Sequence, residues 1–267
     1  MADPNVAVVG IRKARRITRE ARLAGRSLSE GSKCVIGDDQ GRLELAEVLG
    51  LFHRDLDSVQ WKVLREAEKK DLEQFEANAE AAEESIETAE SLIKCQGLPM
   101  DILGAEYSLN RSQLKFYFKA PHRVDFRGLL KDLAGEFSTR IELEQVGPRS
   151  AASIIGGQGR CGREFCCRRF LSDPGPIPME IAQKQELSVS PDRLTGGCGR
   201  LLCCLKYEYE DYVKSLQEMP DLGDEVQCPK GVGEVVSRNV QTRTVTVDLE
   251  DEEEKVELKN SELSPVE

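Results

Sequence analysis

The amino-acid sequence predicts an α+β protein with four successive parts. We assign residues 1–60 to a small N-terminal β unit, 61–98 to a long acidic helix, 99–215 to a ββαβ sheet-helix core that bears a doubled cysteine motif, and 216–267 to a small C-terminal β barrel with an acidic tail. Three observations carry this prediction. Short β-branched or alternating apolar runs recur in three regions, residues 62–95 contain no glycine or proline, and one seven-residue cysteine motif occurs twice.

The N-terminal β unit is predicted from β-branched and alternating runs at Val6–Ile11, Cys34–Ile36 and Leu43–Leu49. The glycine- and aspartate-rich segment Gly37–Gly41 predicts a turn between the second and third runs. Residues 62–95 follow as a helix rich in Glu, Ala, Lys and Leu, with one narrow apolar seam and a solvated acidic face.

The core is predicted from a change of periodicity. Residues 103–109 and 114–118 alternate around a turn at Asn110–Ser112, which predicts a hairpin. Asp125–Phe137 has one apolar helical stripe, and residues 141–143 alternate again, so the order is strand, strand, helix, strand. Alternating valines in the last fifty or so residues predict the short strands of a small barrel.

Charge and hydropathy exclude several classes of protein. Hydrophobic residues make up 39% of the chain, which is enough for a sizeable core. No apolar run is long enough for a membrane span and no secretory leader is recognisable, so we expect a cytoplasmic protein without membrane insertion. The net charge of −11 is concentrated in the long helix and the C-terminal tail, whereas residues 149–206 carry nine bases and five acids.

The nine cysteines are strongly clustered, because six of them lie between residues 161 and 204. An odd number of cysteines in a chain without an export signal argues against a disulfide framework and favours metal binding or redox chemistry. The cluster is an internal repeat. Cys161–Cys167 and Cys198–Cys204 both read Cys-Gly-Arg-x-apolar-Cys-Cys, with each matched position shifted by 37.

The repeated motif has the composition of a tight thiol-bearing turn. Gly162 and Gly199 can take the positive φ that such a turn needs. We expect the first cysteine of each copy to lie near a helix N-terminus, where the helix dipole and the neighbouring Arg163 or Arg200 favour the thiolate.

Structural zinc and cubane iron–sulfur clusters both accept four thiolates. The simplest site takes Cys161 and Cys198 with one cysteine from each vicinal pair, Cys166–Cys167 and Cys203–Cys204. The alternative is that these cysteines only pack in the core. The two histidines, His53 and His122, lie outside the cluster, which disfavours a histidine-ligated zinc finger or a nucleophilic cysteine with a nearby base.

A basic segment near the N-terminus is a second candidate site. Its positive residues are Arg12, Lys13, Arg15, Arg16 and Arg19. They form either a solvated face or a patch for RNA or an acidic partner.

Several motifs together resemble one bacterial family. They are Val124–Arg127, Thr139–Leu143, Gly156-Gly157, the doubled cysteine motif, Ser190-Pro191 and Cys204–Glu208. In these motifs the chain resembles the bacterial YaaT/RicT family. YaaT/RicT proteins belong to a wider family that is named for the C-terminal region of a yeast polymerase suppressor protein. The resemblance is most specific over residues 100–210.

The resemblance implies a cytoplasmic, non-catalytic regulatory subunit that joins small helical partners of the RicA and RicF type. Such a complex carries iron–sulfur clusters, which implies a 4Fe-4S cluster here with zinc as the alternative, and directs RNase Y in messenger RNA maturation, with effects on sporulation. It carries six residues over as cluster ligands or their neighbours: Cys161, Cys166, Cys167, Cys198, Cys203 and Cys204. Two other functions stay open from the residues alone: a metal-stabilised module that binds RNA directly, and a thiol redox sensor or enzyme.

Overall fold

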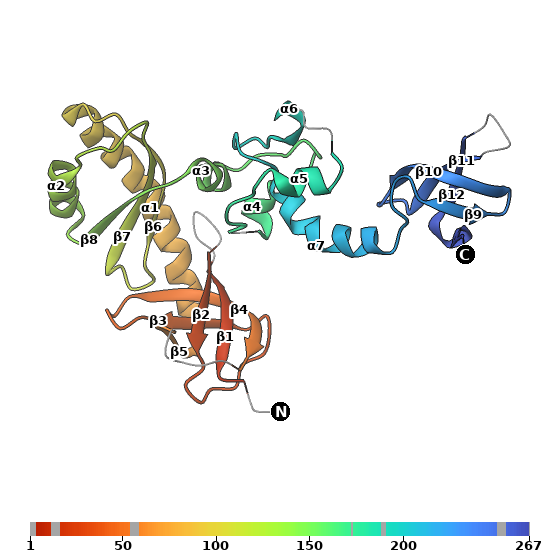
Figure 1. The fold of residues 1–267 in the computed structure, drawn as a ribbon. Helices are drawn as coiled ribbons and strands as arrows, with labels where there is room; N and C mark the ends of the chain where they lie inside the picture. The colour runs from red at the N-terminus through yellow and green to blue at the C-terminus, as the bar shows by residue number, and fades with distance from the viewer. Residues whose placement is uncertain are drawn as a thin grey trace. The chain divides into compact units, whose positions relative to one another are not determined.

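The computed structural model describes residues 4–11, 17–53, 59–171, 173–187, 191–249 and 255–266. Four members of the predicted basic segment, residues 12, 13, 15 and 16, lie outside these ranges, while Arg19 is exposed on a strand. The chain divides into two compact units (Figure 1). The first comprises Met1–Asp173 with Gly196–Arg200, and the second comprises Pro174–Thr195 with Leu201–Glu267.

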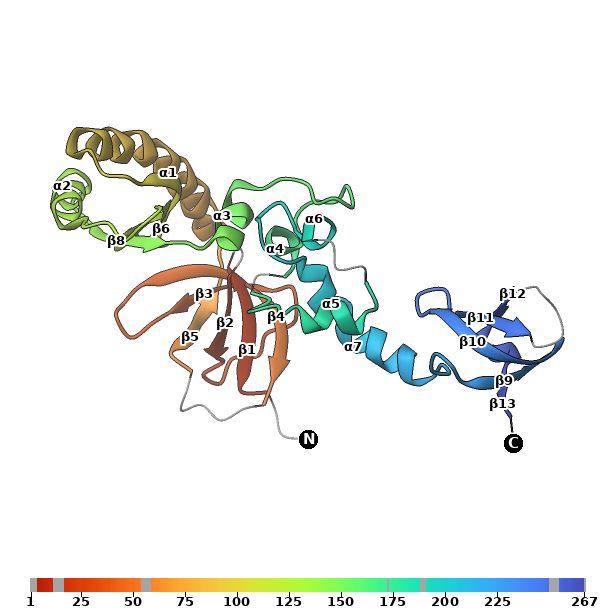
Figure 2. The same ribbon diagram turned by 45° about the horizontal axis from the view of Figure 1, so that its top comes forward.

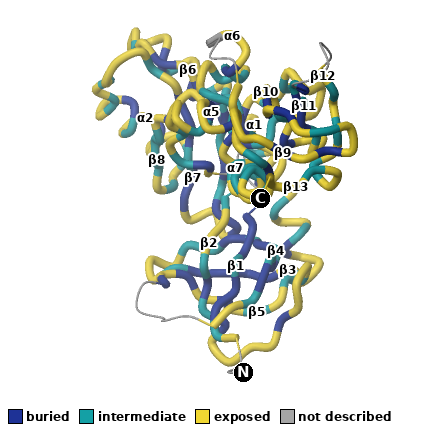
Figure 3. Tube along the Cα trace, turned by 45° about the vertical axis from the view of Figure 1, so that its right-hand side comes forward, coloured by how far each residue is buried: buried dark blue, intermediate teal, exposed yellow. Residues whose placement is uncertain are grey.

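The first unit begins with a closed five-stranded barrel. Its strands are β1 (Val6–Ile11), β2 (Ile17–Arg22), β3 (Lys33–Gly37), β4 (Leu43–Phe52) and β5 (Trp61–Glu66), in the order β1-β2-β5-β3-β4. Alternate residues of these strands point inward, as period-two side-chain alternation requires, and the buried ones are dark blue in Figure 3. Trp61, Ile36, Val9 and Val48 are among the residues that fill the interior.

The predicted helix over residues 62–95 is wrong at its start. Residues Trp61–Glu66 form the last barrel strand, because Trp61 and Val63 alternate into the barrel core, where Trp61 pairs with Ala21 of β2 and Val63 pairs with Ile36 of β3. Helix α1 spans Lys69–Gln96 and ends at Gly97, whose φ of 62° is left-handed. Asp71 marks its beginning: the carboxylate accepts the backbone N–H of Glu68 at 2.8 Å.

The predicted order of strand, strand, helix and strand is present in the first unit, but the predicted core of residues 99–215 is divided, because residues 174–195 and 201–215 belong to the second unit. The three-stranded sheet has the order β6-β7-β8, with β6 (Asp101–Tyr107) antiparallel and β8 (Arg140–Gln145) parallel to the central β7 (Gln113–Lys119). Helices α1 and α2 (Arg127–Phe137) cover one face of the sheet (Figure 2). Phe116, Phe118, Leu129 and Leu133 are fully buried between them.

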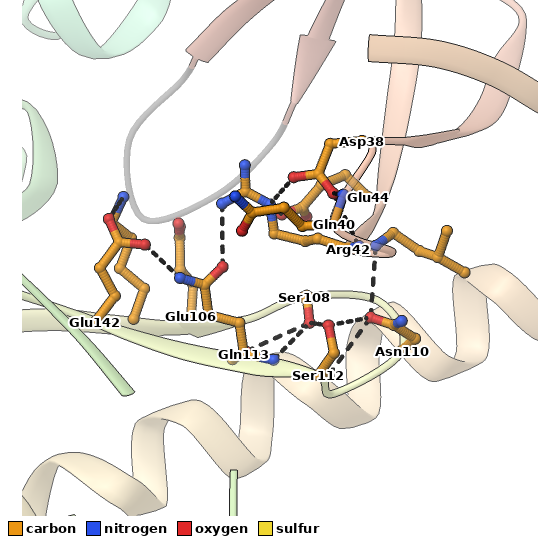
Figure 4. Close-up of polar contacts among 12 residues, drawn as sticks. Asp38, Gln40, Arg42, Glu44, Glu106, Ser108, Asn110, Ser112, Gln113 and Glu142 are labelled. Atoms are coloured by element: carbon orange, nitrogen blue, oxygen red, sulfur yellow. Dashed lines mark hydrogen bonds and ion pairs between the residues drawn. The ribbon is translucent and has the colours of Figure 1, made fainter. Parts of the chain in front are cut away.

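The barrel and the three-stranded sheet meet through two hairpin ends (Figure 4). Leu109 donates its backbone N–H to the carbonyl of Leu43 at 2.7 Å. Asn110 donates to the carbonyl of Gly41 at 2.9 Å, and Arg42 donates to the Gln113 side chain at 3.1 Å. The β6–β7 turn is therefore hydrogen-bonded to the barrel.

The second unit contains short helices followed by a sheet. The helices are α5 (Glu180–Lys184), α6 (Pro191–Leu194) and α7 (Cys203–Gln217). The strands are β9 (Glu225–Cys228), β10 (Gly231–Asn239), β11 (Thr244–Leu249), β12 (Lys255–Lys259) and β13 (Ser264–Pro265), with a 3-10 turn at Asn260–Glu262.

The predicted C-terminal barrel is not closed. Among the described residues the strands form an antiparallel sheet of order β12-β11-β10-β9-β13, and no ladder joins β12 to β13. Alternating valines fix which face of a strand is buried, but they do not fix whether the first and last strands pair. No helix in the described ranges combines the length and the apolar character that a membrane span needs.

Candidate metal centre

The two copies of the cysteine motif adopt the same backbone conformation. In the first copy Gly159 donates its N–H to the carbonyl of Arg163 at 2.8 Å, and in the second Gly196 donates to Arg200 at 2.9 Å. The glycine after each leading cysteine has positive φ, 75° at Gly162 and 72° at Gly199, as predicted. Each turn is also closed by one isolated bridge at matched positions, Gln158 with Glu164 and Thr195 with Leu201.

The helices begin at the second cysteine of each copy. Helix α4 spans Cys166–Arg169, and α7 begins at Cys203. The leading cysteines, Cys161 and Cys198, lie within the turns and are not at a helix N-terminus. The expectation that a helix dipole favours their thiolates is therefore wrong, because the residues between the first and second cysteine form a turn.

The ring of Phe165 brings the two copies together within the first unit. A Cβ atom added at Gly157 would lie 2.9 Å from the ring carbon Cε2, and one added at Gly197 would lie 2.9 Å from Cζ. Only glycine allows the backbone to approach the ring so closely at both positions. No local sequence signal predicts this contact, since the ring and Gly197 are far apart in the chain.

Four of the six motif thiols belong to the first unit. Cys161 is exposed, Cys166 and Cys198 are half-buried and Cys167 is buried. Burial raises the pKa of the Cys167 thiol, and the nearby thiols of Cys198 and Cys166 raise it further. The structure thus places Cys166 and Cys198 each within electrostatic range of Cys167. Cys203 and Cys204 are half-buried in the second unit.

Helix α3 (Pro148–Ile155) fixes the position of the vicinal pair in the first copy. Ser153 donates its hydroxyl to the carbonyl of Cys167 at 2.9 Å. Arg168 donates to the carbonyl of Ile154 at 2.7 Å and pairs with Glu164 at 3.1 Å, so one side chain joins the end of α3 to α4 and the turn. The predicted neighbours Arg163 and Arg200 are exposed.

The motif fits a thiolate-ligated metal by its chemistry, since all six clustered donors are sulfur, the ligand that zinc and iron–sulfur clusters share. The described side chains are not arranged as a finished cage: no three His, Cys, Asp or Glu residues in those ranges lie close enough to hold a metal ion.

Two family models and one well-covered relative match the sequence of this chain. The model for the PSP1 C-terminal conserved region matches residues 61–146, and that for the third domain of PSP1-like proteins matches residues 176–219. The chain is 40% identical over 202 residues to the stage 0 sporulation protein YaaT of Bacillus subtilis (strain 168), which covers 76% of this chain and 74% of that protein. The chain belongs to the YaaT/RicT family.

A second relative matches a shorter part of the chain. An uncharacterized protein of Schizosaccharomyces pombe is 31% identical over 80 residues, which is 30% of this chain and 11% of the yeast protein. No solved structure matches this YaaT/RicT family member.

Proposed function

We propose that this YaaT/RicT family member is a non-catalytic regulatory subunit that holds an iron–sulfur cluster, of the 4Fe-4S type, through its doubled cysteine motif. It acts in the cytoplasm, in a complex with small helical partners of the RicA and RicF type, and directs RNA processing by RNase Y. The named relative is a sporulation protein, so a role in sporulation belongs to the same proposal.

One observation carries the cluster assignment: two cysteine turns of the same conformation meet on the ring of Phe165. A core packing role for the cysteines does not need two matched turns with glycines at positive φ. Four thiols lie in the first unit, Cys161, Cys166, Cys167 and Cys198, and we assign the ligands to this set first. A thiolate-bound cluster would supply binding free energy that is available only to the folded chain.

The raised pKa of Cys167 supports a structural rather than a nucleophilic role for this thiol. A nucleophilic cysteine needs its pKa lowered so that the thiolate is populated, whereas burial does the opposite here. Zinc is the alternative metal, because it accepts the same four thiolates.

The test is metal and sulfide analysis of protein purified without oxygen, together with visible absorption. We expect iron, acid-labile sulfide and a broad charge-transfer band. Cys198→Ser should lose most of the metal, while Cys95→Ser should keep it, since Cys95 is exposed on α1 outside the motif.

Each outcome decides between the functions. Zinc without iron selects the alternative metal. A protein with neither metal contradicts the proposal, and a folded Cys198→Ser variant that retains metal but loses thiol reactivity would support a redox sensor instead.

Direct RNA binding by the cysteine region is the second candidate function. It is favoured by the charge of residues 149–206, nine bases against five acids. A salt titration of RNA affinity tests it, because phosphate contacts make binding weaken steeply with salt. An affinity that does not change with salt excludes it.

A further inference from the structure

The barrel has a basic cavity that lies outside the cysteine region. Its volume is about 770 Å³, and it is lined by residues near the end of β2 and the start of β5. Leu23, Leu28 and Leu51 give it an apolar side, and Arg22, Arg26 and Lys62 give it a positive one.

Two of the cations are held side by side by the fold. Arg22 and Lys62 are direct partners in the parallel pairing of β2 with β5, so their side chains leave the sheet on the same face. Like charges at directly opposed positions destabilise a sheet unless an anion offsets them. The carboxylate of Asp39 pairs with Lys62 at 3.0 Å. The hydrogen bond and charge of Lys62 lower the pKa of this carboxyl, and the charge of Arg22 lowers it to a smaller extent. Asp39 carries one negative charge, and the described residues that line the cavity include three cations and no acid.

Arg22 is oriented for recognition of an anion. Its Nε donates to the carbonyl of Val59 at 2.8 Å, and the side chain is partly buried, so the plane of the guanidinium is fixed. Among the described residues, the hydrogen bond of this guanidinium comes from Nε and not from either terminal nitrogen. A guanidinium held in this way presents a planar pair of N–H donors that matches the oxygens of a phosphate.

The third cation is presented by a tight turn. Arg26 donates its backbone N–H to the carbonyl of Leu23 at 3.0 Å, and the two residues between them are left-handed, with φ of 51° at Ala24 and 78° at Gly25. A left-handed conformation is costly for alanine, so the rest of the fold must hold the turn in this shape. The space over Gly25 is open, since a Cβ atom there would meet nothing within 4 Å.

We propose that this cavity binds the phosphate of a nucleotide. Arg22, Arg26 and Lys62 bind the phosphate oxygens, and the leucine side of the cavity contacts the nucleoside. The cavity volume is within the ordinary range for small-ligand sites, which also combine an apolar lining with a few fixed polar groups. The phosphate can come from a free nucleotide or from one residue of an RNA strand, since both carry the same chemistry.

The test is calorimetric titration of the full-length chain with four probes: inorganic phosphate, adenosine, AMP and a single-stranded RNA of about ten nucleotides. We expect AMP or the RNA to bind more tightly than either phosphate or adenosine. Arg22→Gln and Arg26→Gln should each weaken that binding by about tenfold or more. Arg123→Gln, the same change at an exposed residue outside the barrel, should leave it unchanged.

Asp39→Asn separates loss of binding from loss of folding. The substitution removes the carboxylate that competes for Lys62, so affinity should rise several-fold while the fold is kept. RNA that binds about a hundredfold more tightly than AMP identifies a strand as the source, and equal affinities identify a free nucleotide. Inorganic phosphate binding as tightly as AMP, no binding of either nucleotide probe, or an Arg22→Gln affinity within about twofold of the parent overturns the proposal. The readout does not involve metal, so it fails or succeeds independently of the cluster.

Discussion

The ring of Phe165 touches Gly197, where an added Cβ atom would lie 2.9 Å from Cζ and 3.1 Å from Cε1. The ring cannot simply move away, because its other edge lies against Gly157. This contact joins the residue before Cys166 to the residue before Cys198, and so positions the two cysteine turns of the first unit.

Gly197→Ala should therefore disturb the thiols without removing one. We expect destabilisation of about 1–3 kcal/mol from overpacking and a lower metal content after anaerobic purification. Urea unfolding and metal analysis measure the two effects. Gly135→Ala is the matched control: its Cβ meets nothing within 4 Å and it lies inside α2, so it should raise stability slightly and leave the metal content unchanged. Equal metal content in the two variants would contradict the positioning role of this contact.

Cys34 should make stability depend on pH in the alkaline range. Burial raises the pKa of this thiol from 9.0, its ordinary value, to about 11. Below pH 9 the thiol is protonated in both states; between about 9 and 11 only the unfolded chain releases the proton, so stability falls as pH rises. The loss for this one group approaches about 2–3 kcal/mol.

Other thiols and tyrosines titrate in the same range, so the comparison is between the parent and Cys34→Ala. The variant is expected to be less stable at pH 8 and to lose less stability between pH 9 and 11, measured by denaturant unfolding. Parallel pH profiles for the two proteins would show that burial does not hold this thiol in its neutral form.

The ion pair of Arg65 with Asp71 should stabilise the junction between the barrel and α1. The two nitrogens of Arg65 lie 2.5 and 2.7 Å from the Asp71 carboxylate, which is 8% exposed. A double-mutant cycle with alanine should give a coupling of about 1–2 kcal/mol, reduced from that of a fully buried pair because Arg65 is partly solvated. Lys69 with Glu73 is the control pair, and its exposed side chains should show a coupling near zero.

The Asp71 contribution should also depend on pH. Its hydrogen bond with Arg65 lowers the pKa of this carboxyl below 3.8, the ordinary value for aspartate. A lowered pKa in the folded state means that the stabilisation is present above pH 3.8 and is lost as the pH falls through the lower, folded value. An Asp71→Asn variant should show a shallower decline in acid, and an unchanged decline would contradict the pairing.

Lys115 should be a large single determinant of stability in the first unit. Its ammonium lies 2.7 Å from Glu142 and 2.8 Å from Glu144, and Gln113 also donates to Glu142. Burial opposes its charge, but the two carboxylates more than compensate and raise the pKa of Lys115. Lys115→Met removes the cation that contacts these two partly exposed acids and should cost about 1–3 kcal/mol in chemical unfolding.

Lys119→Met on the same strand is the control for that substitution. Lys119 is 56% exposed and pairs with the exposed Asp101 at 3.3 Å, so its loss should change stability by less than about 0.5 kcal/mol. Similar losses for the two variants would show that the pair of carboxylates near Lys115 is solvated.

The local parts of this fold are readable from the sequence. The hairpin of β6 and β7, helix α2 and strand β8 follow from apolar periods and one turn, because each element buries a single face. The conformation of the cysteine turns follows from glycines such as Gly162, which few other residues could replace at positive φ.

What the sequence did not predict depends on pairing between distant segments. Trp61–Glu66 alternates like a strand, yet it runs into a helical stretch without a breaking residue, and its pairing with β2 and β3 is what makes it part of the barrel. The contact of Phe165 with Gly197 and the pairing of Arg22 with Lys62 likewise join residues that are remote in the chain. Neither has a local signal, since a glycine or a surface cation is compatible with many environments.

The barrel closes through a short seam. In the part of the chain that the structure describes, two residue pairs join β2 to β5, Ala21 with Trp61 and Arg22 with Lys62, whereas the other strand pairs of the barrel have longer ladders. A seam with so few ladder bonds should be the first part of the barrel to open, and its amides should exchange with solvent fastest among the paired strands. An anion that binds Arg22 and Lys62 together spans this seam, so its occupancy would be thermodynamically linked to closure of the barrel.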